Sequence, residues 1–450
     1  MKNDTKFLIV FCGLPATLKT YLSIRLSGRL GYAYIPTKAI GNITGLTEAN
    51  TLYQSRIDRY FDLKNIIDSA INFGANVVVD GGFPTSESRN IILNKTNAER
   101  NILIHCICDE KTRVKRLEKR AKDKQDYENK SAEDILHNLK YHKILAQEEN
   151  PEVELNNKIV NSLLTVDTKK MVLNWKGNPP NDLGDNIMTI IQELLEEVSQ
   201  NNFRVIENEI TKHFNDFAEG YDNTTEWRKN DEILGSMQTN SIPNPSRILD
   251  IGTGTGLASE WYSKQGHLVA GIDISPKMLQ KASDRLNFVL LGNGTKLPFI
   301  DNYFNLIIIR QCLHYVNAKQ LLNEAYRVLK EGGLIVVSGA VCTSEETKNF
   351  WTEFKNATQP LRLEVFTPKE IKDLLESSRY KIGEEKHYSL TRNEKLESIV
   401  KRARNIPGGL HSFLINMEKL SSKLFPELEF KILNDHLQYR QNWITIWAEK

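Results

Sequence analysis

The 450-residue sequence has few cysteines, no long apolar run and almost no net charge. Its five cysteines include no CxxC pair, and their odd number gives no disulfide framework. The longest apolar runs, such as residues 7–12, fall far short of the ~18 residues that a membrane-spanning helix requires. That first run is also too short for the core of a signal peptide. We therefore expect a cytoplasmic protein with reduced thiols that does not span a membrane.

The charges of the chain nearly cancel, with 59 Lys and Arg against 57 Asp and Glu. A general polyanion-binding protein would carry a clear excess of basic residues, so this class is disfavoured. The hydrophobic content of 40% is that of a globular chain and excludes wholesale disorder. At roughly 150 residues per domain, the length predicts two or three domains.

Short apolar runs alternate twice with longer helical patterns, which predicts an α/β fold with two doubly wound, mainly parallel sheets. The first set of runs lies at residues 7–11, 77–79, 102–104 and 163–166. The second set lies at residues 247–251, 268–272, 306–309 and 334–337. We place the boundary near residue 200, so that residues 1–200 form one domain and residues 201–450 the other.

The first domain carries a sequence close to the GxxxxGK[ST] pattern of a phosphate-binding loop. The run GLPATLKT, from Gly13 to Thr20, follows a predicted strand and precedes a predicted helix. Backbone N–H groups would cradle the phosphates of ATP, Lys19 would reach the β- and γ-phosphates, and Thr20 would hold Mg²⁺. Leu18 replaces the second glycine, and a side chain there could narrow or redirect the loop. The alternatives are an ordinary β-to-α turn with a surface lysine, or a domain that binds nucleotide without catalysis.

Two further features of this domain are candidates for phosphate chemistry. Asp80 ends a buried run, where its carboxylate could order Mg²⁺ or accept a proton from an acceptor hydroxyl. Arg116 and Arg120 lie four residues apart on a predicted helix, so both can face the same phosphate. Because acidic residues are interleaved along this helix, a solvated, salt-bridged surface is an equally good interpretation.

Over roughly residues 5–200, these motifs resemble the small P-loop kinases grouped with zeta toxins and polynucleotide kinases. The resemblance rests on the loop from Gly13 to Thr20, on residues 79–83 and on the pair Arg116 and Arg120. It implies transfer of the γ-phosphoryl group of ATP to a hydroxyl. Many members carry an aspartate just after the second strand as general base, whereas residues 34–38 of this chain contain none.

The second domain begins with a strand that leads into a DxGxGxG turn. The glycines are Gly252, Gly254 and Gly256, and they would let the backbone approach a ligand closely. Asp250 precedes the first glycine by two residues, and Asp273 ends the next predicted strand. Asp273 is suited to accept hydrogen bonds from both ribose hydroxyls, and Asp250 to act near the amino-acid end of a cationic sulfonium ligand. This arrangement favours S-adenosylmethionine (SAM) over a dinucleotide.

From about residue 204 to 390 the sequence resembles class I methyltransferases of the ubiquinone/menaquinone-biosynthesis type, which have a Rossmann-like fold. The matching motifs lie at residues 214–222, 292–299, 313–315 and 327–333. The resemblance implies that Asn293, followed by Gly294, contacts the adenine of SAM, with an amide oxygen where the family commonly has a carboxylate. Asn305 also replaces a frequent aspartate, at a position that we expect to be structural.

His314 and a predicted helical insertion bear on the methyl acceptor. His314 could be a general base for a hydroxyl acceptor, or it could flank the SAM pocket. No Asn-Pro-Pro-aromatic motif follows residues 305–309, which disfavours methylation of a DNA-base amino group. The insertion, at about residues 391–430, could cover the acceptor pocket, or it could be a structural lid or a dimer surface.

The motifs together predict a bifunctional protein, in which an ATP-binding kinase-like domain and a SAM-dependent methyltransferase act on one small-molecule acceptor. One alternative is an RNA-end modifier, with a kinase and a methyltransferase acting on the same end. Another is a methyltransferase regulated by a nucleotide-binding domain that transfers no phosphate, which the substitution at Leu18 suggests. The sequence does not indicate the acceptor or the oligomeric state.

Overall fold

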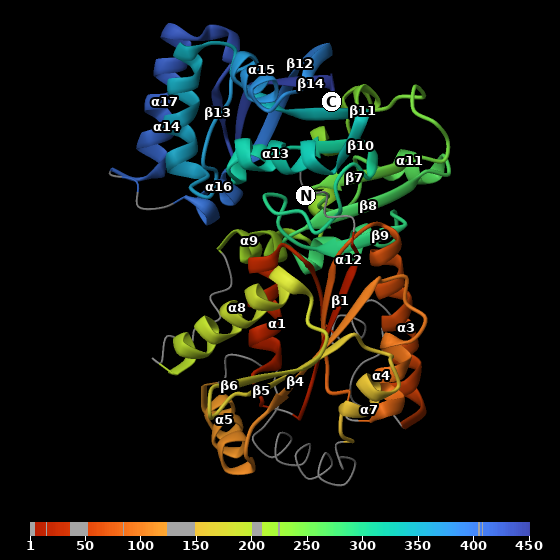
Figure 1. The fold of residues 1–450 in the computed structure, drawn as a ribbon. Coiled ribbons are helices and arrows are strands. Elements are labelled where there is room, and N and C mark those ends of the chain that lie inside the picture. Colours follow the sequence, from red (N-terminus) through yellow and green to blue (C-terminus); the bar gives the residue numbers. More distant parts are fainter. Residues whose placement is uncertain are drawn as a thin grey trace. The chain divides into compact units, whose positions relative to one another are not determined.

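A computed structural model of the chain describes residues 5–14, 16–36, 53–83, 85–123, 149–199, 209–223, 226–403, 406 and 408–450. The chain divides into an N-terminal unit, Met1–Ile206 with Pro298–Ile300, and a C-terminal unit, Glu207–Leu297 with Asp301–Lys450. Each unit has its own sheet, of six strands in the first and eight in the second (Figure 1). Two consecutive α/β folds are thereby confirmed.

The sheet of the N-terminal unit is parallel except at one edge. In spatial order its strands are β2 (Ala33–Pro36), β3 (Val77–Asp80), β1 (Phe7–Cys12), β4 (Arg100–Ile107), β5 (Ser162–Asp167) and β6 (Val172–Gly177). All six residues of β1 are buried, as expected for a central strand that is covered on both faces. The antiparallel edge strand β6 was missed by the sequence analysis, because it is mostly exposed and lacks an apolar pattern.

Helices cover both faces of this sheet (Figure 1). α1 (Lys19–Leu30) and α8 (Asn181–Ser199) lie on one face, and α3 (Tyr53–Asn72), α4 (Ser86–Leu93) and α7 (Glu152–Asn156) lie on the other. α5 (Glu110–Asp123) follows β4. The core between the first pair of helices and the sheet is aliphatic and aromatic, and it includes Phe11, Leu22 and Ile191.

The sheet of the C-terminal unit joins a parallel part to an antiparallel part. In spatial order its strands are β12 (Lys381–Lys395), β14 (His436–Glu449), β11 (Leu329–Val341), β10 (Phe304–Arg310), β7 (Arg247–Ile251), β8 (Leu268–Asp273) and β9 (Phe288–Leu291), with β13 (Lys431–Leu433) paired to β14. The strands from β11 to β9 are parallel, and β14 runs antiparallel to β11 and β12. The strand order reverses between β7 and β10, and open parallel sheets bind ligands at the carboxyl ends of their strands at such a point.

The helices of this unit begin with α9 (Glu209–Phe217), the 3₁₀ helices η2 (Tyr221–Asn223) and η3 (Glu226–Lys229), and α10 (Asp231–Ser236). Next come α11 (Glu260–Lys264), α12 (Pro276–Ala282), η4 (Leu313–Tyr315) and α13 (Ala318–Val328). α14 (Glu345–Thr358), α15 (Pro368–Ser377), α16 (Leu396–Arg402), α17 (Leu410–Leu424) and η5 (Pro426–Leu428) complete the unit. No described helix is long and apolar enough to cross a membrane.

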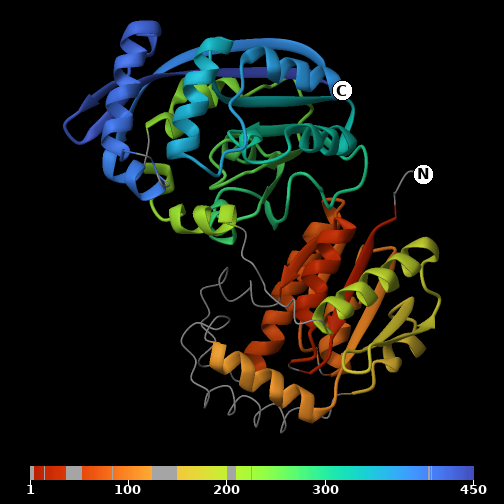
Figure 2. The ribbon, with the colours of Figure 1, turned by 90° about the vertical axis from the view of Figure 1, so that its left-hand side faces the viewer.

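The predicted helical insertion begins later than expected. Residues 391–395 belong to β12, because they pair antiparallel with residues 436–440 of β14. The helical part is α16 and α17, which pack with α14 at one end of the sheet (Figure 2). Their shared core is aromatic: Trp351, Phe354, Phe430 and Tyr439 lie with ring centroids between 5.1 and 6.3 Å apart.

Candidate functional site

The phosphate-loop candidate of the N-terminal unit keeps a glycine-like backbone despite Leu18. Leu18 has a φ of 66°, in the left-handed region that glycine usually supplies. Its side chain is 5% exposed and belongs to the core formed with Phe11 and Leu22. The leucine is therefore accommodated by the core below the loop. Gly13 cannot be replaced in the same way, because a Cβ there would lie 2.2 Å from the carbonyl oxygen of Cys106.

Lys19, Thr20 and Asp80 meet at this loop. Thr20 Oγ1 donates a hydrogen bond of 2.5 Å to Asp80 Oδ2, and Lys19 Nζ donates one of 2.8 Å to the carbonyl oxygen of Leu14. Tyr34 of β2 donates a 2.7 Å hydrogen bond to Asp80 Oδ1, and burial together with the Asp80 charge raises the pKa of Tyr34 far above its usual value. Since P-loop proteins hold Mg²⁺ between such a threonine and such an aspartate, the pair fits that role. The described residues hold no group of three or more His, Cys, Asp or Glu that could bind a metal by themselves.

Arg116 lies beside the loop and connects it to the turn after β5. Its Nη1 donates hydrogen bonds of 3.1 Å to the carbonyl oxygen of Ala16 and 3.0 Å to Thr168 Oγ1. Its Nη2 donates to the carbonyl oxygen of Thr168 at 3.1 Å. The side chain of Arg120 falls outside the described residues. A two-arginine phosphate clamp therefore stays a prediction.

In the C-terminal unit, the glycine-rich turn after β7 fits closely against its neighbours. Gly252, Gly254 and Gly256 have φ values of 68°, 55° and 84°, all in the left-handed region. A Cβ on Gly252 would lie 2.7 Å from Cys312 Cβ, so the turn packs directly against the segment that follows β10. The Gly252 N–H donates a 2.9 Å hydrogen bond to the carbonyl oxygen of Ile272, which ties the turn to the end of β8.

Asp273 is held by backbone groups on both sides. Its Oδ2 accepts a 2.9 Å hydrogen bond from the Gly254 N–H, and its Oδ1 accepts one of 2.9 Å from the Ser275 N–H. Burial raises the pKa of this carboxyl above its usual value, although the backbone hydrogen bonds oppose the shift. The carboxylate is thus fixed beside the glycine turn, at the strand end where a ribose was expected.

One carboxylate oxygen of Asp250 accepts hydrogen bonds, and the other has no hydrogen-bond partner among the described residues. Its Oδ2 accepts hydrogen bonds from Thr253 Oγ1 at 2.8 Å and from Ser259 Oγ at 2.6 Å. Its Oδ1 is buried and has no hydrogen-bond partner among the described residues. Burial raises the pKa of Asp250 to about 6. An ammonium group would supply both the missing donor and a compensating charge, so the site fits the amino-acid end of SAM.

Asn293 and Gly294 follow β9 at the same edge of the sheet. Asn293 Oδ1 accepts hydrogen bonds of 2.9 Å from both the N–H and the hydroxyl of Thr295, and the side chain is exposed. A Cβ on Gly294 would lie 2.6 Å from Ile251 Cγ2, so this position requires glycine for packing. Contact with an adenine ring stays a prediction. Asn305 accepts a 3.1 Å hydrogen bond from the Arg247 N–H, which is a structural role.

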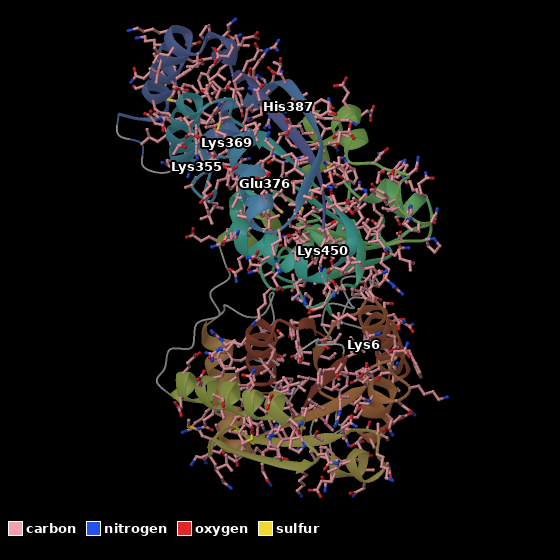
Figure 3. The ribbon with its side chains drawn as sticks, turned by 45° about the horizontal axis from the view of Figure 1, so that its top comes forward. Lys6, Lys355, Lys369, Glu376, His387 and Lys450 are labelled. Carbon is pink, nitrogen blue, oxygen red and sulfur yellow. The ribbon has the colours of Figure 1, made fainter. Side chains whose placement is uncertain are left out.

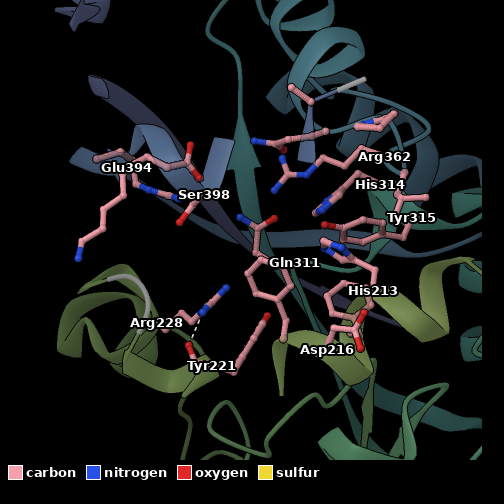
Figure 4. A pocket seen from close by; sticks show the side chains of 18 of the residues that line it. His213, Asp216, Tyr221, Arg228, Gln311, His314, Tyr315, Arg362, Glu394 and Ser398 are labelled. Carbon is pink, nitrogen blue, oxygen red and sulfur yellow. Dashed lines mark hydrogen bonds between the residues drawn. The ribbon is translucent and has the colours of Figure 1, made fainter. Parts of the chain in front are cut away.

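His314 lies in η4, directly after β10, and lines a cavity of about 1240 Å³ (Figure 4). The residue is 7% exposed, and its Nε2 has no hydrogen-bond partner among the described residues. Burial and the nearby Arg362 charge hold the pKa of His314 well below its usual value, so the imidazole is neutral at physiological pH. A neutral imidazole can accept a proton, and the position also flanks the glycine turn through Cys312. Both roles stay predictions.

Several residues that line this cavity were not singled out as functional by the sequence analysis. They are Tyr221, Arg228, Gln311, Arg362 and Arg392. They come from segments far apart in the chain, and only Tyr221 lies within a motif of the sequence analysis, at residues 214–222. Ser398 of α16 also lines the cavity, which places the helical insertion at the border of this pocket.

Two family models match parts of the chain. Residues 249–337 match a methyltransferase domain family, and residues 8–143 match an AAA domain family. A demethylmenaquinone methyltransferase of Tropheryma whipplei (strain Twist) is 36% identical over 143 residues, which is 29% of this chain and 58% of that protein. The 18S rRNA (guanine-N(7))-methyltransferase of Bos taurus is 34% identical over 128 residues, 25% of this chain and 46% of that protein. The chain thus spans about half the length of the curated relatives it matches.

Among solved structures, a SAM-dependent methyltransferase from Archaeoglobus fulgidus is 22% identical, with a TM-score of 0.30 over 46% of this chain and 87% of that one. The segment matched by the methyltransferase family model contains the glycine-rich turn, and the segment matched by the AAA family model contains the phosphate loop. The chain is thus similar to a methyltransferase domain family in its C-terminal unit and to an AAA domain family in its N-terminal unit, and its methyltransferase part is also similar to a demethylmenaquinone methyltransferase.

Proposed function

We propose that this protein is a SAM-dependent methyltransferase for a small-molecule acceptor, with an N-terminal domain that binds ATP and Mg²⁺. The observation that carries the proposal is the buried Asp250, whose Oδ1 lacks a donor beside a glycine turn and the fixed carboxylate of Asp273. The relation to demethylmenaquinone methyltransferases supports a small-molecule acceptor.

Each side chain has a distinct task in binding. Asp273 accepts hydrogen bonds from the ribose hydroxyls, Asp250 compensates the ammonium group, and Asn293 with Gly294 borders the adenine. SAM supplies an activated methyl group: the acceptor nucleophile bonds to the methyl carbon while the C–S bond breaks and sulfur keeps the electron pair. His314 Nε2 is neutral and without a partner, so it accepts the proton that a hydroxyl acceptor loses. The cavity walls align the acceptor, which supplies much of the acceleration.

In the N-terminal domain, Lys19 and Thr20 bind the phosphates and Mg²⁺ of ATP, and Asp80 completes the metal site. The Thr20–Asp80 hydrogen bond supports this assignment. In the bifunctional form of the proposal, this domain phosphorylates the same acceptor that the C-terminal domain methylates.

A second candidate function is regulation of methylation by nucleotide binding without phosphoryl transfer. Asp80 already accepts hydrogen bonds on both carboxylate oxygens, from Thr20 and from Tyr34, which favours a structural and metal-ordering role over that of a general base. β2, whose four residues are all described, contains no carboxylate that could act as the base in place of Asp80.

The two candidates are separated by one labelling experiment. The protein is incubated with a cell extract, methyl-labelled SAM and Mg²⁺, with and without ATP, and the labelled products are identified by mass. A methylated product that also carries phosphate and requires ATP supports the bifunctional enzyme. A small methylated product without phosphate, made faster with ATP in the wild type but not in Lys19→Ala, supports regulation. Label that appears only in RNA would contradict a small-molecule acceptor.

A further inference from the structure

The large cavity of the C-terminal unit has one wall whose polar groups lack partners. This wall is built by the segment after β10, which carries Gln311 and His314, and by the loop between α14 and α15, which carries Arg362. Figure 4 shows the side chains of these three residues directed toward the same space. The cavity is large enough for a drug-sized molecule.

Hydrogen bonds to backbone groups hold the loop that carries Arg362 in place. Lys355 of α14, labelled in Figure 3, donates hydrogen bonds of 3.1 and 3.2 Å to the carbonyl oxygens of Arg362 and Leu363. The Leu363 N–H donates one of 2.7 Å to the carbonyl oxygen of His314, which joins the loop to η4. The guanidinium of Arg362 lies 5.9 Å from the centre of the Tyr315 ring.

Within the described part of the chain, Arg362 forms no ion pair with a carboxylate, and its buried Nε has no hydrogen-bond partner. Four acidic residues, Glu209, Asp216, Glu219 and Glu394, also line the cavity, yet none of them pairs with this arginine. A half-buried guanidinium costs free energy when its donors are unused, so a ligand oxygen would stabilise it.

Two residues near Arg362, His314 and Gln311, indicate where the reacting atom of the acceptor would bind. His314 Nε2 and Gln311 Oε1 are both buried without partners among the described residues. Gln311 has a φ of 55°, a strained backbone for a residue with a side chain, and such strain gathers at ligand sites. These two groups flank Cys312, which packs against Gly252 of the glycine turn. The segment that carries both groups therefore contacts the glycine turn at Cys312.

The opposite wall adds positive charge. The guanidinium of Arg228 lies 3.5 Å from the centre of the Tyr221 ring and donates a hydrogen bond to the Tyr221 carbonyl oxygen. Arg392 also lines the cavity. Burial is the main cause that lowers the pKa of Arg228, and the nearby charge of Arg392 lowers it as well. Arg228 and Arg392 thus place two further positive charges at the cavity, beside its four carboxylates.

We propose that the methyl acceptor carries an anionic group, a phosphate or a carboxylate, which binds the Arg362 guanidinium while its nucleophilic atom lies beside His314 and Gln311. The inference rests on the proposed function, because it names the acceptor class of that same site. A guanidinium offers a planar pair of donors that matches either anion.

Binding of simple probes tests the inference without knowledge of the natural acceptor. Phenyl phosphate, benzoate and phenol share one ring and differ in the anionic group, and each is titrated into the full chain by calorimetry or ligand-observed NMR. We expect at least one anion to bind about tenfold more tightly than phenol. Tighter phenyl phosphate identifies a phosphate acceptor, and tighter benzoate a carboxylate acceptor. Equal binding of all three would overturn the proposal.

Variants assign the effect to the arginine. Arg362→Gln should weaken the anion about tenfold and leave phenol unchanged, while Arg362→Lys should recover part of the loss because it keeps the charge. Arg379→Gln is the matched control, since Arg379 lies 4.1 Å from the Tyr326 ring but is exposed and does not line the cavity. An equal loss in Arg379→Gln, or no loss in Arg362→Gln, would refute the assignment.

SAM binding measured on the same samples separates the two proposals. Anion binding through Arg362 without SAM binding would refute the proposed methyltransferase function and leave an anion site. SAM binding without anion discrimination would refute the acceptor class and leave the methyltransferase.

Discussion

Replacing Asp250 by asparagine should stabilise the free protein above neutral pH while it weakens SAM binding. Burial raises the pKa of Asp250 from 3.8 to about 6. The folded state therefore binds more protons than the unfolded state between these values, so this carboxyl reduces stability as the pH rises through about 6. The difference between these two pKa values corresponds to ~3 kcal/mol of lost stability at high pH, and about half of this loss develops between pH 5 and pH 8.

The asparagine removes this penalty and keeps an oxygen for Thr253 and Ser259. Its amide nitrogen replaces the unpartnered Oδ1 and costs about 1–2 kcal/mol, because it is buried without an acceptor. The variant should thus gain about 1–2 kcal/mol over the wild type at pH 8, and little or nothing at pH 5. For a domain of this size, that corresponds to roughly 2–8 °C in Tm.

Thermal unfolding of both proteins at pH 5, 6, 7 and 8 measures the effect, with Asp284→Asn as an exposed control. A difference in Tm between Asp250→Asn and wild type that does not grow with pH would refute the destabilising role of the Asp250 charge. The same pH-dependent difference in Asp284→Asn would refute it as well. In calorimetry, SAM should bind the variant roughly 10- to 100-fold more weakly, as expected when a charge-assisted hydrogen bond is lost.

Three further outcomes follow from the structure. Leu18→Gly should destabilise the N-terminal unit by about 2–3 kcal/mol in denaturant unfolding, because the lost core leucine outweighs the ~1 kcal/mol of relieved left-handed strain; a stabilised variant would contradict this. Lys19→Ala should weaken ATP binding at least tenfold, while Lys111→Ala on the exposed surface of α5 should not. Once an acceptor is known, the methyl-transfer rate should show no loss assignable to His314 between pH 8 and pH 6, because its lowered pKa keeps it neutral there. A fall with a midpoint near 6.5 that disappears in His314→Gln would show that the imidazole titrates normally.

Local motifs were enough to predict β7 and the turn that follows it. β7 has the bounds predicted for it, and the three glycines of its turn adopt positive φ values. Thr367 caps α15, since its side chain accepts a hydrogen bond from the Glu370 N–H. Each of these features depends on residues within one turn or strand, so the sequence carries the whole signal.

Features that depend on distant contacts could not be predicted. The exposed strand β6 and the extra residues of β12 are defined by their pairing partners, β5 and β14. The cavity wall depends on Arg362 and His314, whose segments are joined by the hydrogen bond from the Leu363 N–H to the His314 carbonyl oxygen, across 49 residues. The burial of the Leu18 side chain could not be predicted either, because it depends on the core below the loop.

Calorimetric titration of SAM into the full-length chain tests the central claim most directly. We expect one saturable site per chain, with binding weakened at least tenfold in Asp273→Asn and unchanged in Asp284→Asn. Absence of saturable binding, or the same affinity in all three proteins, would contradict a methyl-donor site formed by the glycine turn and Asp273.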